Sequence, residues 1–514
     1  MTEGLSTRPD DRSHACRQSG EAVRRLSADV IAGSAVFAAA LAARLLPVFV
    51  FPGVNHADEV FQTVEQAHRL VFGTGTVPWE FVYGTRSWVL PGALAGLMAA
   101  SLAFGDGPDF YMPAIGLALA ALGAASALCA FLWGRRFFGI SGGVVAGTVT
   151  AVWIDAVYFG PRALSDSVAA HILVIALYLG TPARPVIVTR WRPIAAGALL
   201  ALAGSLRIQL LPAIGVVGMW QLSTIFRGQR VAFACSGLLT ALLYGAVDGL
   251  TWSYPFEALW RNVVANLYYG VQTDFGVMPW YWYLSTLIEY WTGLSAVMLG
   301  LCLIGAVRLP QPFVAALLIA ASLSLLGHKE LRFIYPAILL GVIVSGVGLA
   351  QLVSWIGEAL ENKGWTRHNA TTETCAVALA LVVLAQLALA TGSRPYNDLW
   401  TSGRGIVMAA RYVARIKLVC GIGILDHDWG AYAWFHHAVP LYWGTPDDPL
   451  DRDSVAFNTV VYDKGKPVGF GYVTRACFHK SCVAQRQGNC SPAPKKSMPA
   501  PPSLHDPWKP ELNR

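Results

Sequence analysis

The chain has 514 residues, of which 55% are hydrophobic and only 13% are charged, and its mean hydropathy is positive. This composition excludes an ordinary soluble globular protein and indicates a polytopic membrane protein. The net charge of +7 comes from short basic clusters between apolar runs, so we interpret these residues as topology determinants and expect no nucleic acid partner.

The first apolar stretch, residues 28–51, follows an arginine-rich segment. It is longer than the core of a signal peptide, so we predict a retained span that leaves residues 1–27 in the cytoplasm. Residues 89–104 form a shorter apolar run that begins after Arg86 and contains Pro91. We predict an interfacial or re-entrant helix there, because this choice places the basic clusters of the later loops on the cytoplasmic side.

Residues 28–391 therefore form the predicted transmembrane domain, an all-α bundle with its N-terminus inside, its C-terminus outside and a large first external loop at about residues 52–110. A helix of roughly 20 residues spans the hydrocarbon core, and the apolar runs indicate about eleven transmembrane helices. Their predicted ranges are 28–51, 111–133, 139–159, 165–180, 194–206, 208–225, 231–252, 284–304, 312–327, 334–355 and 373–391.

Hydropathy drops after residue 391. Residues 392–475 have the short apolar runs and turn residues of a small external α/β domain. Residues 476–514 are polar and proline-rich, and we predict that this tail is disordered. Cys477, Cys482 and Cys490 lie in the tail, where a disulfide can form if the tail faces an oxidising compartment. The sequence does not select the pair.

Two adjacent carboxylates, Asp58 and Glu59, follow the first span in "HADEVFQ". Neighbouring side chains on a helix point about 100° apart, so only one of them can readily face a given cavity. Both carboxylates could be solvated caps of the helix that follows. The alternative is a general base in a cleft at the membrane surface.

A second charged group, "GHKELRF", stands between two apolar runs and contains His328, Lys329, Glu330 and Arg332. Lysine and arginine are ordinary at a membrane interface. The predicted topology nevertheless places this group outside, where the positive-inside rule predicts few cations. An anion site, and a phosphate site in particular, is therefore the alternative interpretation.

Arg207 lies between two apolar runs, and an arginine in such a place is either a functional group with an anionic partner or half of a structural ion pair, with Asp166 as the candidate. Trp280 and Trp282 belong to "PWYWY" at the start of a span. They fit an interfacial aromatic belt, although sugar-stacking aromatics would look the same.

Taken together, these segments resemble the family 22 glycosyltransferases, which are polyprenyl-phosphate-mannose-dependent mannosyltransferases with the GT-C fold. The resemblance spans about residues 30–360. Within the family, the motif sequences and their spacing are most similar to those of the members that add the third mannose of glycosylphosphatidylinositol anchors. One departure is Met278, where the family commonly has a histidine. The matching motifs are "HADE", "AHRLVFGTG", "PWEF", Arg86-Ser87, "RALSDS" and "HKELRF".

The resemblance implies an inverting transfer of mannose from polyprenyl- or dolichyl-phosphate mannose to a glycan or glycolipid hydroxyl on the external face. Asp58 or Glu59 would be the general base, and the implied donor phosphate ligands are His328, Lys329, Arg332 and Arg207. Because the lipid phosphate is a good leaving group, no metal or cofactor is expected. The implied substrate-binding residues are His56, Trp79, Glu80, Arg86, Trp280, Trp282 and Glu330.

Two alternatives stay open at this point. A GT-C transferase could use another polyprenyl-linked sugar, such as arabinose or glucose. A transporter of lipid-linked sugars would need polar groups at the membrane midplane and access from both sides, whereas the charged groups here lie on one face. Short loops favour a bacterial inner membrane with a periplasmic site, and an endoplasmic reticulum membrane with a lumenal site is the alternative.

Overall fold

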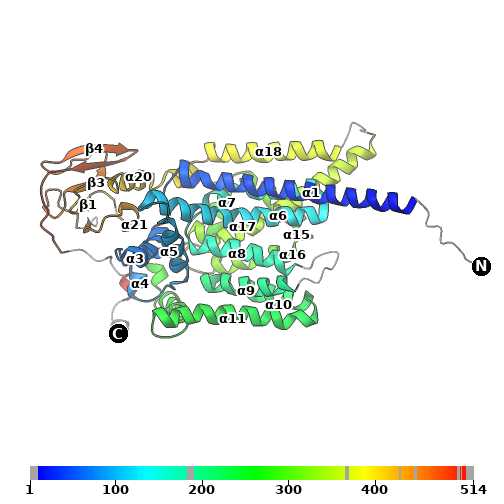
Figure 1. Cartoon of the computed structure of the whole chain (residues 1–514), viewed down its shortest axis with the longest axis horizontal. Coiled ribbons are helices and arrows are strands. Elements are labelled where there is room, and N and C mark those ends of the chain that lie inside the picture. Colours follow the sequence, from blue (N-terminus) through cyan, green and yellow to red (C-terminus); the bar gives the residue numbers. More distant parts are fainter. Residues whose placement is uncertain are drawn as a thin grey trace, which may run out of the picture.

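The computed structural model describes residues 10–181, 190–364, 370–427, 430–444, 448–494, 498 and 501–504. Figure 1 shows a bundle of helices along the long axis of the molecule, with a small sheet beyond one end and the N-terminus at the other. Between the bundle and the sheet lie the short helices of the first external loop, which are α2 (Ala57–Glu59), α3 (Glu65–Phe72), α4 (Trp79–Val82) and α5 (Val89–Ser101).

Five segments are long and apolar enough to cross a membrane, namely Ser27–Val50, Pro108–Val152, Arg227–Thr251, Leu331–Asn362 and Ala370–Gly392. They belong to α1 (Asp10–Leu45) with η1 (Leu46–Val50), α6, α11, α17 and α18. A sixth is added if α14 (Trp282–Trp291) and α15 (Leu294–Ala306), bent by 111°, are counted as one span. The chain is therefore a multi-pass membrane protein.

Shorter apolar helices of 10–17 residues occupy most of the other predicted spans. They are α8 (Ser165–Gly180), α9 (Trp191–Leu206), η3 (Ile208–Leu210) with α10 (Leu211–Thr224), and α16 (Pro310–Ser324). The helical ranges thus follow the predicted ones closely. Because these helices are short for the full hydrocarbon core, the count of about eleven transmembrane helices stays a prediction.

Helix α6 contains a break at Phe138 and Gly139, where Gly139 takes a φ of +66°. The two arms fold back on each other, since a Cβ on Gly134 would lie 2.4 Å from the Gly142 carbonyl oxygen and one on Gly143 would lie 2.9 Å from Phe131. Glycine removes the side chains that would keep the arms apart, as is common where membrane helices meet. The break explains why the sequence predicted two spans here.

Helix α17 is the centre of the bundle, with 83% of its most apolar window buried, against 22% for α11 and 17% for α18. A Cβ on Gly348 would lie 1.9 Å from the Leu301 carbonyl oxygen, and one on Gly305 would lie 2.0 Å from that of Val344. Small residues therefore let α15 and α17 touch along their backbones. The first turn of α17 carries part of the charged group "GHKELRF".

The external domain contains a five-stranded sheet in the order β2-β1-β3-β5-β4. The strands are β1 (Ile422–Ile424), β2 (Leu441–Trp443), β3 (Thr459–Asp463), β4 (Val473–Phe478) and β5 (Ser481–Gln485), and α20 (Arg404–Val413) packs on the sheet. β1 is parallel to β2 and β3, whereas β5 pairs antiparallel with β3 and β4.

The predicted boundary of this domain at residue 475 is wrong. Strand β5 lies between β3 and β4, and its residues Ser481 to Ala484 are buried, so the fold continues well into the predicted tail. Disulfides join Cys477 to Cys482 and Cys420 to Cys490. Sequence inspection missed Cys420 because it lies 70 residues before its partner.

A buried carboxylate joins the first external loop to the external domain. Glu65 in α3 accepts backbone N–H groups from Thr76 at 2.7 Å, Tyr432 at 3.0 Å and Ala433 at 2.9 Å. Burial raises the pKa of Glu65 to about 7, because it outweighs the opposing effect of these hydrogen bonds. The last two partners belong to α21 (Tyr432–Phe435), so the loop and the domain are held together as one unit.

Candidate active site

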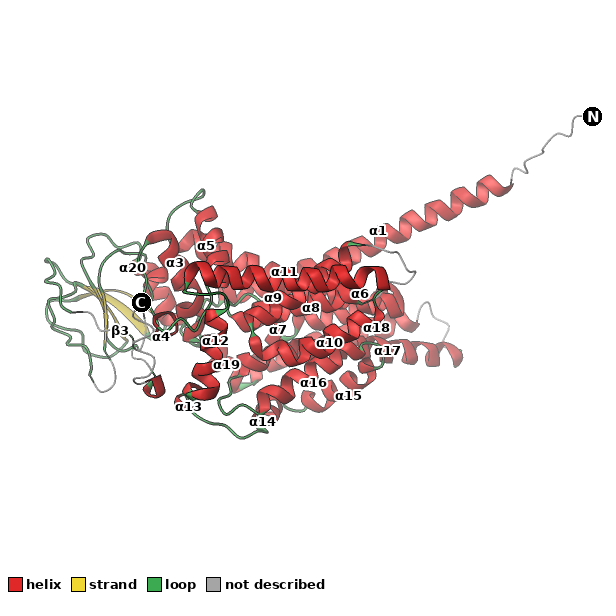
Figure 2. Cartoon of the chain, turned by 90° about the horizontal axis from the view of Figure 1, so that it is seen from below, coloured by secondary structure: helices red, strands yellow, loops and turns green. Residues whose placement is uncertain are grey.

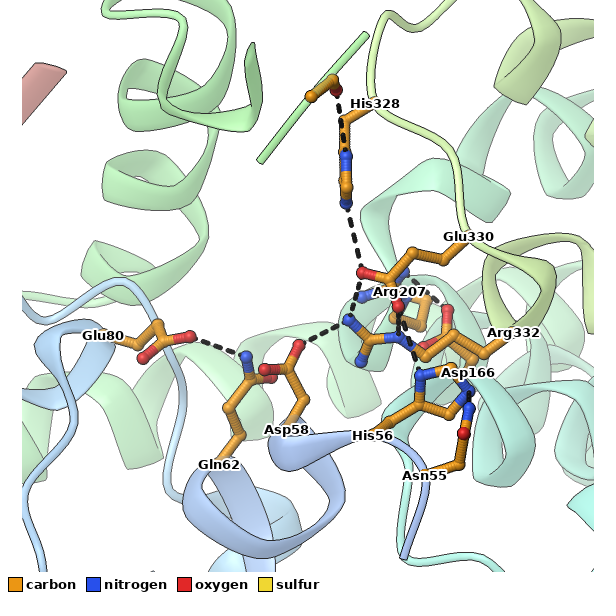
Figure 3. A network of polar contacts seen from close by, with 11 residues as sticks. Asn55, His56, Asp58, Gln62, Glu80, Asp166, Arg207, His328, Glu330 and Arg332 are labelled. Carbon is orange, nitrogen blue, oxygen red and sulfur yellow. Dashed lines mark hydrogen bonds and ion pairs between the residues drawn. The ribbon is translucent and has the colours of Figure 1, made fainter. Parts of the chain in front are cut away.

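The start of the first external loop meets the start of α17 at an ion pair. Asp58, in α2, contacts Arg332 with Oδ2 and Nη2 2.6 Å apart, although the two residues are 274 positions apart in the chain. Figure 3 shows Asp58 between this arginine on one side and Glu80 with Gln62 on the other. The two charged motifs of the sequence therefore form one site.

Glu330 organises the arginine side of this site. It accepts hydrogen bonds from Arg332 Nε at 2.8 Å and Nη2 at 2.9 Å, and it contacts His56 Nδ1 at 3.2 Å and His328 Nε2 at 3.1 Å (Figure 3). Burial alone would raise the pKa of Glu330, but the hydrogen bonds from His56 and Arg332 lower it well below its usual range. An ionised Glu330 thus fixes the Arg332 guanidinium against Asp58.

Asp58 is an ionised carboxylate whose side chain is half-buried at the wall of the site. Burial acts to raise its pKa, but the charges of Arg332 and Arg86 act more strongly together, and the pKa lies below its ordinary value. Arg332 contacts only Oδ2, and no described residue bonds Oδ1. One carboxylate oxygen therefore remains to accept a proton.

Asp58 lines a cavity of about 370 Å³ at the external end of the bundle. The cavity is bounded by the first external loop, by the segment that contains α12 (Glu257–Val263) and α13 (Val271–Asp274), and by the ends of α10 and α16. Its polar lining comprises Asp58, Gln62, Trp79, Glu80, Arg86, Arg207, Gln209, Asn262, Asn266, Gln272, Ser322, His328, Glu330 and Arg332.

A second cavity, of about 60 Å³, shares Gln62, Arg86, Arg207, Gln209 and Asn262 with the large one. It adds six hydroxyl groups, from Thr63, Thr85, Ser87, Ser165, Ser205 and Tyr244. Hydroxyl and guanidinium donors are the groups that bind phosphate oxygens. We call this space the hydroxyl pocket.

The two arginines at the hydroxyl pocket differ in their partners. Arg207 is paired with Asp166, with 2.5 Å between Nη2 and Oδ1, and both side chains are buried. The Arg86 side chain has no ion pair among the described residues, and its buried Nε has no hydrogen-bond partner there. Arg86 is thus the cavity arginine whose charge is left for a ligand.

Glu80 is a further acid of the large cavity, and it is buried. Its Oε1 accepts a hydrogen bond from Gln62 Nε2 at 2.7 Å. Burial, and next the negative charge of Asp58, raise the pKa of Glu80 from 4.5 to about 7. Two neighbouring carboxyl groups with pKa values moved apart are typical of sites where one is charged and the other carries a proton.

Glu59 turns away from this cavity. Its Oε2 lies 3.6 Å from Arg162 Nη1 and its Oε1 lies 3.4 Å from the Ala163 backbone nitrogen. It lines a separate cavity of about 70 Å³ together with Arg411 and Trp434. The two adjacent carboxylates therefore face different spaces, as their helical geometry predicts.

Four other predicted site residues lie outside the cavity lining. Lys329 bonds the backbone oxygen of Met278 at 3.1 Å and that of Leu326. Trp280 is 70% exposed, and Trp282 begins α14 without lining the cavity. His56 acts on the site only through Glu330. The predicted phosphate role of Lys329 and the predicted substrate contacts of both tryptophans therefore have no support in the geometry.

The cavity lining also contains five amide side chains that no sequence motif indicated, namely Gln62, Gln209, Asn262, Asn266 and Gln272. Neutral amides carry no charge signal and belong to no motif, although Asn262 and Asn266 stand one helical turn apart in a predicted external loop. Amides next to an aromatic ring suit the hydroxyl groups of a sugar.

A family model described as the Alg9-like mannosyltransferase family matches residues 35–396, a range that includes every residue lining the two connected cavities. The chain belongs to this mannosyltransferase family. The resemblance to family 22 is confirmed, whereas the sheet of the external domain lies outside the matched range.

Curated relatives carry mannosyltransferase names. "GPI mannosyltransferase 3" from Drosophila melanogaster is 28% identical over 360 residues, which are 64% of this chain and 58% of that protein. "GPI alpha-1,2-mannosyltransferase 3" from Mus musculus is 26% identical over 348 residues, which are 62% of this chain and 59% of that protein. The chain spans less than two thirds of the length of these relatives.

Among solved structures, ArnT from Cupriavidus metallidurans bound to undecaprenyl phosphate is similar, with a TM-score of 0.52 and 14% identity, over 88% of this chain and 97% of ArnT. The apo state of ArnT gives a TM-score of 0.50 at 13% identity. At these identities the likeness concerns the fold alone. It confirms the GT-C fold that the sequence resemblance implies.

Proposed function

We propose that this chain is an inverting mannosyltransferase that moves mannose from polyprenyl- or dolichyl-phosphate mannose to a hydroxyl of a glycan or glycolipid. The observation that carries the proposal is the position of Asp58, ionised and held by Arg332, on the wall of a cavity that also contains Arg86, which has no ion pair among the described residues. Membership of a mannosyltransferase family supports the choice of sugar.

In the proposed reaction, Asp58 accepts the proton of the acceptor hydroxyl through the oxygen that Arg332 leaves open. The acceptor oxygen attacks the anomeric carbon of the β-linked donor from the opposite face, and the bond between that carbon and the phosphate oxygen breaks. The electron pair leaves with the polyprenyl phosphate, and an α-mannoside results. Arg332 positions the carboxylate and is fixed in turn by Glu330.

The hydroxyl pocket is the proposed place of the donor phosphate, with Arg86 and Arg207 as its cations. Preorganised cations stabilise the charge that develops on the leaving group, and the hydroxyl groups of the pocket can donate hydrogen bonds to phosphate oxygens. His328 lines the large cavity but bonds Glu330 and the Gly276 backbone oxygen, both at 3.1 Å. It is therefore a weaker candidate for the phosphate than Arg86.

The sugar and the acceptor would share the large cavity, where Trp79 offers a stacking surface and the amides offer hydrogen bonds. Apolar residues from α10 and α16, including Pro212 and Leu323, line the same cavity and would meet the polyprenyl chain. A substrate that is half lipid and half sugar therefore explains why the carboxylates stand where the bundle meets the external loops.

The site would face an oxidising compartment, because the external domain beside it holds two disulfides. Periplasm and endoplasmic reticulum lumen both satisfy this condition. The earlier preference for a bacterial inner membrane rested on loop length alone, and the curated relatives, which come from fly, mouse and other eukaryotes, give it no support.

The test is transfer of radiolabelled sugar in membranes that contain the wild type or Asp58→Asn. We expect labelled product from polyprenyl-phosphate mannose, none from the arabinose or glucose donors, release of the label by an α-mannosidase, and no product with Asp58→Asn. Transfer from the arabinose or glucose donor would show that the transferred sugar is not mannose. Movement of labelled mannolipid across the bilayer without any product would identify a transporter instead.

A further inference from the structure

The segment after the last strand returns from the sheet to the bundle. It starts at the disulfide between Cys490 and Cys420, and its backbone is fixed by Ser491, whose N–H donates to the Val455 oxygen at 3.0 Å. Ala493 N–H then donates to the Tyr442 hydroxyl at 3.2 Å. We call residues 490–494, 498 and 501–504 the C-terminal strap. Its first part is fastened to the sheet.

The far end of the strap is docked as firmly. Residues Pro502–Leu504 form a short 3₁₀ turn, and Leu504 is only 2% exposed. The Ser503 N–H donates to Asp274 Oδ2 at 3.0 Å, and the Ser503 hydroxyl bonds the same oxygen. Between the two ends, Met498 packs against the buried cluster that contains Val54 and Phe61. The predicted disorder of the whole tail is therefore wrong for these residues.

Leu504 sits where the two walls of the large cavity meet. Its buried neighbours are Tyr83 from the first external loop and Ala265 and Val271 from the second, with Trp79 packed alongside. Residues one or a few positions away line the cavity, namely Glu80 on one wall and Asn262, Asn266 and Gln272 on the other. Figure 2 shows α4 of the first wall beside α12 and α13 of the second.

We propose that the C-terminal strap clamps these two walls together and so sets the shape of the substrate cavity, with Leu504 as a positioning residue. Neither wall is a membrane-spanning helix, and each is a chain of short helices. The walls touch directly where Arg261 Nη1 donates to the Tyr83 oxygen at 3.3 Å, and Leu504 adds a buried apolar contact to this one. Burying one leucine between the two walls favours the arrangement in which the walls touch by a factor of roughly ten to a hundred. The effect on catalysis rests on the proposed function, whereas the docking does not.

The docking is tested with a disulfide between two new cysteines, Ser503→Cys and Asp274→Cys, in the full chain in membranes. The hydrogen bonds between the native residues show that the side chains meet, so we expect the pair to cross-link under mild oxidation. The mismatched pair Ser503→Cys with Glu289→Cys, whose second site is exposed on α14, serves as the control. Equal cross-linking of both pairs, or of neither, would overturn the docking.

The clamp is tested with Leu504→Ala and Leu504→Asp, and with Phe470→Asp as the matched control, because Phe470 is an apolar side chain of the external domain that is 94% exposed. We expect KM for the mannosyl donor or the acceptor to rise roughly tenfold while kcat stays within about twofold, since a loosened wall weakens binding and leaves Asp58 and Arg332 in place. Unchanged KM in both Leu504 variants would overturn the proposal, and so would an equal rise in the control.

A readout without catalysis separates this proposal from the proposed function. Asn266→Cys places a thiol on the second wall, inside the cavity, and its labelling by a membrane-impermeant maleimide reports how open the cavity is. We expect labelling to speed up roughly tenfold when Leu504→Asp is added, even if the wild type transfers no mannose. An unchanged labelling rate would overturn the proposal that the strap clamps the two walls, whatever the enzyme assay shows.

Discussion

The two cavities beside α2 each contain one of the adjacent carboxylates, but in different surroundings. We call the cavity of about 70 Å³ that Glu59 lines the small cavity. Asp58 faces about 370 Å³ of space that also contains Arg86, an arginine without an ion pair in the described part of the chain. The pKa of Asp58 is lowered by Arg332 and Arg86 against the effect of burial. Glu59 faces about 70 Å³ beside Arg162, whose guanidinium also lies 4.3 Å from the Tyr158 ring and bonds the Gly53 oxygen. The space in front of Asp58 is therefore about five times larger than the space in front of Glu59.

This difference teaches that adjacency in sequence is a poor guide to shared chemistry. A rotation of about 100° between neighbouring helical residues sends Asp58 and Glu59 to opposite sides of the first external loop. Glu59 then ties that loop to the segment around Arg162 and Ala163. We infer that Glu59 supports the position of Asp58 and does not touch substrate.

The sharpest way to break the comparison is to neutralise each carboxylate in turn. We expect Asp58→Asn to lower kcat by roughly 10²–10⁴-fold, the range for loss of a general base. Glu59→Gln keeps its size and one hydrogen-bond acceptor, so we expect a loss of no more than about tenfold. Both are measured as initial rates of mannose transfer at equal protein level. If Glu59→Gln instead lowers kcat more than Asp58→Asn does, Glu59 is the general base and the acceptor binds in the small cavity.

Much of this site could be predicted from the sequence because its charges fall in compact motifs. Asp58, Glu330 and Arg332 were singled out by their type and by their place at the ends of apolar runs. Their pairing was not predictable, since no local rule joins residues 274 positions apart. The fate of Lys329 was not predictable either, because it depends on the extended backbone of Glu330 just before α17 begins.

The fold shows the same division. Apolar runs predicted the helix positions well, since the hydrophobic pattern is local. The place of β5 in the sheet and the docking of Leu504 depend on contacts with distant segments, and a short run such as "SCVAQ" carries no local sign of them. Long-range pairing is what the sequence alone left open.

A second prediction compares the arginines of the two cavities. Arg86→Met removes a cation that has no ion-pair partner in the described part of the chain, so the fold loses little and the leaving phosphate loses a counter-charge. We expect kcat to fall by roughly 10²-fold, the scale for loss of one electrostatic donor to a transition state. Arg86→Lys should recover part of the rate. Full activity in Arg86→Met would contradict the proposed placement of the donor phosphate in the hydroxyl pocket.

The matching change in the small cavity is Arg162→Met. It leaves the half-buried Glu59 without its ion pair and removes the bond to the Gly53 oxygen, so we expect a loss of about 1–3 kcal/mol in stability. The measurement is the Tm of the detergent-solubilised protein, which should fall by several degrees, while kcat of the remaining folded enzyme stays within about threefold. A large loss of kcat with an unchanged Tm would instead place Arg162 at the substrate.

The smallest expected effect concerns the proton on Glu80. Its pKa of about 7 lies above the ordinary 4.5, so the folded protein favours the protonated acid, and this contribution to stability is present in acid and lost as pH rises through about 7. Ionisation there also adds a negative charge beside Asp58, which disfavours a second anion in the cavity. We expect kcat/KM for the phosphate-bearing donor to fall about two- to fivefold between pH 6 and pH 8 in the wild type. In Glu80→Gln, which keeps an acceptor for Gln62 and cannot ionise, that slope should disappear, and a slope that persists would assign the titration to another group.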